Sequence, residues 1–241
     1  MNYDLVVQPD PDALAQVAGD RVVEIACNAL QHRGHFRMAL SGGGTPGVLY
    51  RLLAAEPYRS RMPWGKTEVY WGDERHLPHG DPGRNDTTVI PLLSTAGVPD
   101  VQIHPMPYVA GDPDAAARRY EAVLLAQRLP AQPMLDLILL GMGTDGHTAS
   151  LFPGTPALLE ERRLVVANIA IYANRHPERI TLTFPALAEI EVAMFLVTGA
   201  SKRSMLHRVL APPEDLPFPA QRVRPASGRV LWLVDRAAMG G

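Results

Sequence analysis

The apolar run at residues 135–140 (LDLILL) constrains the fold of this chain more than any other feature. A short run rich in Leu and Ile and bounded by glycine is typical of a buried strand in a parallel sheet. Gly141 follows at once, and glycine lets the backbone turn tightly and approach a ligand closely. Asp145, His147 and two hydroxyl side chains come next. The junction therefore predicts a buried strand that leads into a functional site.

The same glycines match the G-x-G-x-x-G pattern of dinucleotide-binding proteins. The match consists of Gly141, Gly143 and Gly146. However, Pro153 would end the following helix after about two turns. The next predicted strand, at residues 164–167, is not followed by the acid that binds the ribose hydroxyls. Asp145 also stands where the negative pyrophosphate would have to approach, so we do not expect a nicotinamide or flavin cofactor.

The composition excludes several classes of protein. The 241 residues are 46% apolar and 20% charged, which supports one substantial folded domain over 1–241. The formal net charge of -2 offers no basic surface for nucleic acid. No apolar run is long enough to cross a membrane, and no secretory signal is recognisable. A single cysteine, Cys27, fits the reducing cytoplasm and has the helical spacing of a core side chain.

Strands and helices alternate along the chain. Strands are predicted at residues 5–7, 36–40, 68–71, 101–106, 135–140, 164–167, 180–184, 192–197 and 230–234. Four helices are predicted, at about residues 11–31, 47–55, 113–129 and 203–210. Asp235 is predicted to cap a short final helix. Residues 211–220 are predicted to form a proline-rich surface loop. This order predicts an α/β fold: a three-layer sandwich with a mainly parallel, Rossmann-like central sheet.

Four predicted strands end in glycine-rich or polar sequence. These endings are SGGGT after residue 40, GDER after 71, GMGTDGH after 140 and TGASK after 197. Ligands of open parallel sheets bind beyond the carboxyl ends of the strands. Because neighbouring strands lie about 4.8 Å apart, four such endings can surround one small molecule.

The chemistry of these endings indicates an anionic, hydroxylated ligand. The loop from Ser41 to Thr45 offers successive backbone N–H groups ahead of a helix, a usual setting for phosphate. It is not a Walker loop, because Gly-Lys-Ser/Thr is absent. Lys202 opens another helix, where its charge opposes the helix dipole. This placement favours a bound anion nearby, although the residue could instead be an ordinary solvated lysine. Arg75 and Arg179 are further candidates, although either could instead form an ordinary surface or local ion pair.

His147 is the candidate general base, since imidazole exchanges protons near neutral pH. The alternative is a structural histidine that caps a helix. The pairs His32/His35 and His76/His79 lack the additional ligands of a zinc site, so no metal is expected. No G-x-S-x-G elbow indicates a serine nucleophile.

Taken together, these residues resemble the glucosamine-6-phosphate isomerase/6-phosphogluconolactonase family, and in particular its lactonases. The matching stretches are residues 41–46 (SGGGTP), 71–78 (WGDERHLP), 141–154 (GMGTDGHTASLFPG), 179–187 (RITLTFPAL), 198–202 (TGASK) and 231–237 (LWLVDRA). The deaminases of this fold have Asp-Glu-Tyr where this chain has Asp73, Glu74 and Arg75. That position favours the lactonases. Arg84 replaces the Ser that the family commonly has before Asn85, and it is a further candidate for a phosphate contact.

The resemblance implies hydrolysis of 6-phospho-D-glucono-1,5-lactone, a step of the oxidative pentose phosphate pathway, without metal or organic cofactor. The implied catalytic residues are His147, Asp73 and Arg75. The implied substrate-binding residues are Ser41, Gly42, Gly43, Gly44, Thr45, Asn85, Gly143, Asp145, Arg179 and Lys202. Either Asp73 or Asp145 would orient the imidazole or the sugar hydroxyls. A cytoplasmic monomer or weak homodimer is expected, with no nucleic-acid or membrane partner.

Two alternatives remain on the sequence alone. One is a glucosamine-6-phosphate deaminase or sugar-phosphate isomerase on the same fold. The other is a non-catalytic sugar-phosphate sensor. The roughly 35 residues before the first glycine loop are too few for the DNA-binding module that such a sensor would carry.

Overall fold

A six-stranded parallel sheet forms the centre of the molecule, which we describe from a computed structural model that covers residues 3–171, 175–212 and 217–240. The strand order is β1-β9-β8-β5-β2-β3. The strands are β1 (Asp4–Gln8), β9 (Arg229–Asp235), β8 (Ile190–Val197), β5 (Leu135–Leu140), β2 (Phe36–Leu40) and β3 (Thr67–Trp71). Every residue of β5 and β2 is buried, as expected of central strands covered on both faces. The predicted parallel sheet and its central apolar strand are confirmed.

A second, three-stranded antiparallel sheet has the order β4-β7-β6. It consists of β4 (Asp73–Arg75), β7 (Glu178–Leu182) and β6 (Val165–Ile169). The strands expected at residues 164–167 and 180–184 therefore do not extend the parallel sheet. Gly72 joins the two sheets, because its N–H donates to Leu40 O at 2.8 Å and its carbonyl accepts from Leu182 N at 2.9 Å. The chain thereby carries residues 73–75 from the end of β3 onto the second sheet.

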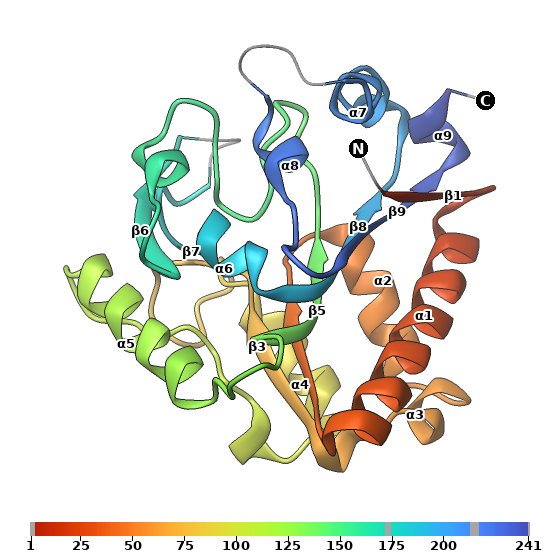
Figure 1. Cartoon of the computed structure of the whole chain (residues 1–241), viewed down its shortest axis with the longest axis horizontal. Coiled ribbons are helices and arrows are strands. Elements are labelled where there is room, and N and C mark those ends of the chain that lie inside the picture. The colour runs from red at the N-terminus through yellow and green to blue at the C-terminus, as the bar shows by residue number, and fades with distance from the viewer. Residues whose placement is uncertain (1–2, 172–174, 213–216, 241) are drawn as a thin grey trace.

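Helices complete the layers. They are α1 (Pro11–Arg33), α2 (Gly44–Leu53), α3 (Tyr58–Arg61), α4 (Asp86–Ala96), α5 (Pro113–Ala126), α6 (Phe184–Ala188), α7 (Arg203–Leu210), α8 (Pro219–Arg222) and α9 (Arg236–Met239). α1 packs on β1, β9, β5 and β2, whereas α5 packs on β6 and β7. Figure 1 shows α1 and α2 on one side of the central sheet and α5 with the second sheet on the other.

Aspartate caps fix the helix starts that the sequence predicted. The side chain of Asp10 accepts from Ala13 N at 2.8 Å, that of Asp112 from Ala115 N at 2.8 Å, and that of Asp235 from Ala238 N at 2.7 Å. Such caps satisfy amides that have no partner within the helix. The helix after Asp112 ends at Ala126 rather than near residue 129.

The prediction of a strand at residues 101–106 is wrong. Only Ile103 forms an isolated parallel bridge, to Val69, and a short 3-10 turn (Asp100–Gln102) precedes it. Pro105 and Pro107 have no backbone N–H, so a ladder of hydrogen bonds cannot continue through them.

Two further expectations need correction. Cys27 is exposed, because the buried stripe of α1 runs through neighbouring positions such as Val22, Ala26 and Ala29 and leaves the cysteine facing solvent. The loop predicted at 211–220 gives way to α8 from Pro219, a residue that favours the first turn of a helix. Residues 213–216 of that loop lie outside the described residues.

Within the part of the chain that the structure covers, no helix is both long and apolar enough to span a bilayer.

Candidate active site

The four strands with glycine-rich or polar endings are neighbours in the sheet, in the order β8-β5-β2-β3. Because all four are parallel, their carboxyl ends meet at one edge, as the sequence predicted. A pocket of about 270 Å³ opens there. Its lining residues are Ser41, Gly42, Gly43, Gly44, Thr45, Pro46, Asp73, Arg75, Asn85, Gly141, Met142, Gly143, His147, Ala149, Ser150, Phe152, Arg175, Arg179, Leu196, Val197, Thr198 and Lys202.

Every predicted site residue except Asp145 and Arg84 lines this pocket. Asp145 lies behind it and contacts His147, with 2.6 Å between Asp145 Oδ1 and His147 Nδ1. Burial alone would raise the pKa of Asp145, but the hydrogen bond and charge attraction to His147 outweigh it and lower that pKa. Asp145 rather than Asp73 is therefore the acid that contacts the imidazole.

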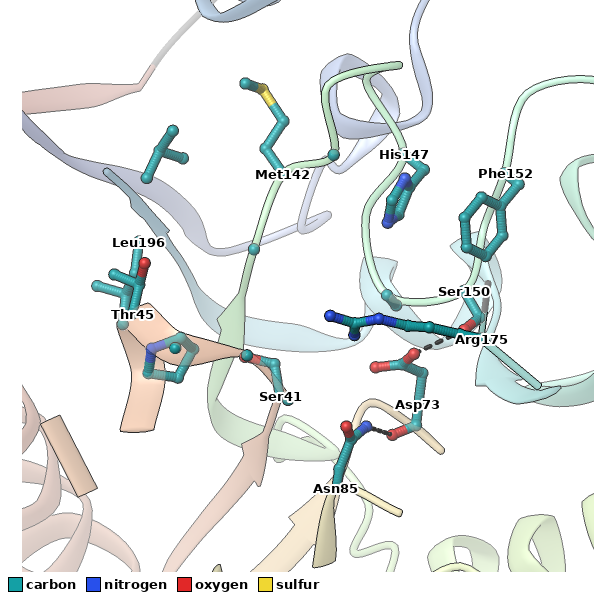
Figure 2. A pocket seen from close by; sticks show the side chains of 18 of the residues that line it. Ser41, Thr45, Asp73, Asn85, Met142, His147, Ser150, Phe152, Arg175 and Leu196 are labelled. Atoms are coloured by element: carbon teal, nitrogen blue, oxygen red, sulfur yellow. Dashed lines mark hydrogen bonds between the residues drawn. The ribbon is translucent and has the colours of Figure 1, made fainter. Parts of the chain in front are cut away.

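The loop of His147 is held by its own backbone. Gly143 N donates to His147 O at 2.8 Å, and Gly146 N donates to Gly143 O at 3.1 Å. The ring of Phe152 packs against the imidazole, with 4.1 Å between ring centroids. Figure 2 shows the His147 side chain projecting into the pocket above Asp73 and Arg175. The sequence placed this histidine after β5, and the tight turn is what aims its ring at the pocket.

The glycine loop after β2 forms a second wall. α2 starts at Gly44, and its N-cap residue Gly43 provides no side-chain cap, so the first amides of the helix face the pocket side uncapped. The hydroxyl of Tyr50 holds the start of the loop, since it accepts from Ser41 N at 2.9 Å and donates to Ser41 O at 2.8 Å. The hydroxyls of Thr45 and Thr198 lie 2.7 Å apart and join this loop to the end of β8.

The residues after β3 supply the third wall. The hydroxyl of Ser150 donates to Asp73 Oδ2 at 2.6 Å, and Asn85 Nδ2 donates to Asp73 O at 3.0 Å (Figure 2). Arg75 and Arg179 are directly opposite each other on β4 and β7. Arg75 donates to Gly83 O.

Positive charge dominates the pocket. Its basic side chains are Arg75, Arg175, Arg179 and Lys202, and Asp73 is the one acidic residue among the described residues that line it. Burial is the main cause that lowers the pKa of Arg179, and the charge of Arg75 adds to it. The buried Nε of Arg179 has no hydrogen-bond partner among the described residues. A buried cation with an unused donor beside a second cation favours a bound anion.

Arg84 does not line this pocket. Its side chain is fully buried, and its guanidinium bonds Asp86 Oδ1 at 2.9 Å as well as the carbonyls of Leu77 and Met106. The guanidinium holds the segment before α4 together. The possible phosphate contact of Arg84 is therefore replaced by a structural ion pair with Asp86.

Replacing Arg84 with methionine is expected to lower the free energy of unfolding by about 3–5 kcal/mol, because the buried carboxylate of Asp86 loses its counterion. Urea denaturation followed by circular dichroism measures the change. The double variant Arg84→Met/Asp86→Leu should lose less, since no unpaired charge is left buried. Equal stability of Arg84→Met and the wild type would contradict the structural role.

The sequence did not single out Arg175, Ser150 or Phe152 as site residues. Ser150 and Phe152 lie within the family-like segment at 141–154. The sequence around Ser150 gives no sign that its hydroxyl contacts Asp73 on β4. Arg175 carries no motif at all. Among the described residues, no cluster of three or more His, Cys, Asp or Glu side chains could hold a metal ion.

Comparison with known proteins gives one consistent result. The model of the family described as glucosamine-6-phosphate isomerases/6-phosphogluconolactonase matches residues 9–232. A 6-phosphogluconolactonase of Nostoc sp. is 38% identical over 99% of this chain and 98% of its own length. One of Synechocystis sp. is 40% identical over 87% of this chain and 86% of its own. The solved structure of 6-phosphogluconolactonase from Trypanosoma cruzi superposes with a TM-score of 0.87 at 26% identity, covering 100% of this chain and 97% of that one.

Proposed function

Because this chain is an enzyme that belongs to the glucosamine-6-phosphate isomerase/6-phosphogluconolactonase family, we propose that it hydrolyses 6-phospho-D-glucono-1,5-lactone to 6-phospho-D-gluconate. The observation that carries this proposal is the His147–Asp145 pair, joined at 2.6 Å, beside a pocket lined by four basic side chains. A base and a cationic pocket are what the hydrolysis of a phosphorylated ester requires.

His147 acts as the general base. Its Nδ1–H donates to the carboxylate of Asp145, which places the lone pair of the neutral imidazole on Nε2. Nε2 takes a proton from water as the water oxygen attacks C1 of the lactone. The tetrahedral intermediate then collapses, the bond from C1 to the ring oxygen breaks, and the imidazolium returns its proton to that oxygen. A lactone is already an activated ester, so no covalent nucleophile is needed.

Two groups are positioned to stabilise the oxyanion that develops at C1. One is the guanidinium of Arg75, and the other is the set of backbone N–H groups of the glycine-rich turns. Lys202, Arg179 and the loop from Ser41 to Thr45 hold the phosphate. Binding of this remote group positions C1 near His147 and so contributes to the rate.

Purified protein is expected to form 6-phosphogluconate from the phosphorylated lactone well above the uncatalysed rate, and to act poorly on glucono-1,5-lactone without the phosphate. Product formation can be followed with a coupled dehydrogenase assay. Ammonia release from glucosamine 6-phosphate is measured in parallel, because the deaminases share the fold. Ammonia release without lactone hydrolysis would establish the alternative activity and reject the proposal.

A further inference from the structure

Glu74 is a fully buried carboxylate that does not line the active-site pocket. Its two oxygens accept hydrogen bonds from three backbone amides. Oε1 accepts from Arg75 N at 2.8 Å and from Asn85 N at 2.7 Å, and Oε2 accepts from Asp86 N at 2.9 Å. One side chain therefore ties β4 to the start of α4 across the intervening loop.

Two of these amides belong to residues that line the pocket, Arg75 and Asn85. The side chain of Asn85 in turn donates to Asp73 O at 3.0 Å. It also packs against the glycine loop so closely that a Cβ on Gly42 would lie 1.9 Å from Asn85 Oδ1. The placement of Arg75, Asn85 and the backbone of Asp73 thus depends on contacts that start at Glu74.

We propose that Glu74 is a positioning residue, whose ionised carboxylate holds Arg75 and Asn85 in the geometry that binds the substrate. The inference rests on the proposed function, because it takes these two residues to contact the substrate. A carboxylate offers both oxygens as acceptors, whereas a protonated carboxyl or an amide presents a donor in place of one of them. Either change leaves a backbone N–H facing another donor, and the segment carrying Arg75 and Asn85 must shift.

The charged groups around Glu74 come from three elements. Asp86 of α4 is negative and is paired with Arg84. Arg179 of β7 is the cation on the second sheet whose charge interacts with Glu74, and the hydroxyl of Tyr120 on α5 also interacts electrostatically with it. Burial raises the pKa of Glu74 to about 7, and the charge of Asp86 adds to the rise. The backbone hydrogen bonds lower the pKa but do not outweigh the effect of burial. The positioning carboxylate is therefore gained and lost close to neutral pH.

The test replaces Glu74 with glutamine and uses Glu121→Gln as the matched control. Glu121 also accepts backbone amides, from Leu164 N at 2.5 Å and Val165 N at 3.3 Å, but it joins α5 to β6 and does not line the pocket. At a temperature where both variants are folded, Glu74→Gln is expected to lower kcat/KM for the lactone about 10- to 100-fold. Glu121→Gln should keep the wild-type value. Equal kcat/KM in wild type and Glu74→Gln would overturn the proposal.

The pH dependence separates positioning from a general loss of stability. Both enzymes contain the same His147–Asp145 pair, so the ratio of the wild-type kcat/KM to that of Glu74→Gln reports on Glu74. The ratio should be largest above pH 7 and shrink as the pH falls and Glu74 is protonated. A ratio that does not change between pH 8 and pH 5.5 would count against the ionised carboxylate as the active form.

Stability gives an independent readout. Because the pKa of Glu74 is raised in the folded state, its protonated form stabilises the fold at low pH, and this contribution is lost as the pH rises through about 7. The free energy of unfolding of the wild type should therefore fall with rising pH relative to that of Glu74→Gln. If the free energies of unfolding of wild type and Glu74→Gln changed in parallel with pH, the raised pKa of Glu74 would be contradicted.

Two provisions keep the inference testable. If Glu74→Gln does not fold, Glu74→Asp retains the charge but is one methylene too short to reach all three amides, and a wild-type kcat/KM in that variant overturns the proposal. If the wild type does not hydrolyse the lactone, the proposed function fails. Binding of 6-phosphogluconate, measured by calorimetry with wild type and Glu74→Gln, then tests the positioning role alone, and equal affinities reject it.

Discussion

Replacing His147 with alanine is expected to lower kcat for the phosphorylated lactone about 10³-fold, because the water that attacks C1 loses its general base. KM should change little, since Lys202, Arg179 and the glycine loop, the groups that we propose hold the phosphate, are untouched. The measurement is product formation above the spontaneous rate, since the lactone also hydrolyses on its own. A His147→Ala variant with wild-type kcat would show that another group activates the water.

A second imidazole–carboxylate pair provides a matched control. His104 Nε2 lies 2.6 Å from Glu68 Oε2, the same separation as in the His147–Asp145 pair. His104 does not line the active-site pocket, so His104→Ala should keep the wild-type kcat. Asp145→Asn is expected to lower kcat about 10²-fold while the His147 imidazole stays in place. The amide of the new side chain no longer fixes the His147 tautomer that has its lone pair on Nε2.

Replacing Gly143 with alanine is the second substitution with a large expected effect, a fall in kcat of about 10²-fold or more. A Cβ at this position would lie 2.0 Å from His147 Nδ1 and 2.3 Å from Asp145 Oδ1. Both distances are far inside van der Waals contact, so the hydrogen bond between the two side chains cannot form. The loop cannot swing away freely, because Gly143 N donates to His147 O.

Gly141→Ala is the control for this substitution. Gly141 belongs to the same loop, but a Cβ there meets no atom of the described residues within 4 Å. Its effect on kcat should be much smaller, and Gly141→Ala should be the more thermally stable of the two variants, because no atom has to move to admit its Cβ. A Gly143→Ala enzyme as active as Gly141→Ala would show that the His147–Asp145 contact is not needed for turnover.

Much of the site was predictable because its parts lie within short stretches of chain. The apolar run at 135–140 is β5, with the same ends. The sequence pattern also placed SGGGT, GDER, GMGTDGH and TGASK after strands, and the structure brings those four strands together as neighbours. Parallel strands share the edge at which they end, so local patterns were sufficient to gather these residues.

Which side chains contact each other was not predictable in this way. The spacing left Asp73 and Asp145 equal as partners of His147, and only the turn at 143–147 decides for Asp145. Arg84, a candidate for a phosphate contact, instead forms a buried ion pair with Asp86, two residues further on. Glu74 lay inside a recognised motif, yet two of its three amide contacts are with residues more than ten positions away.

The sequence by itself determined the periodic apolar pattern, the helix caps and the chemistry at each strand end, and these imply a parallel α/β fold with a pocket for an anionic, hydroxylated ligand. The cytoplasmic location and the monomeric or weakly dimeric state stay predictions from the sequence. Tertiary structure alone decided that β4, β6 and β7 form a separate sheet and which arginines line the pocket. The physical reason is range: periodicity and capping act within a few residues, whereas pairing partners and burial depend on segments that meet only when the chain is folded.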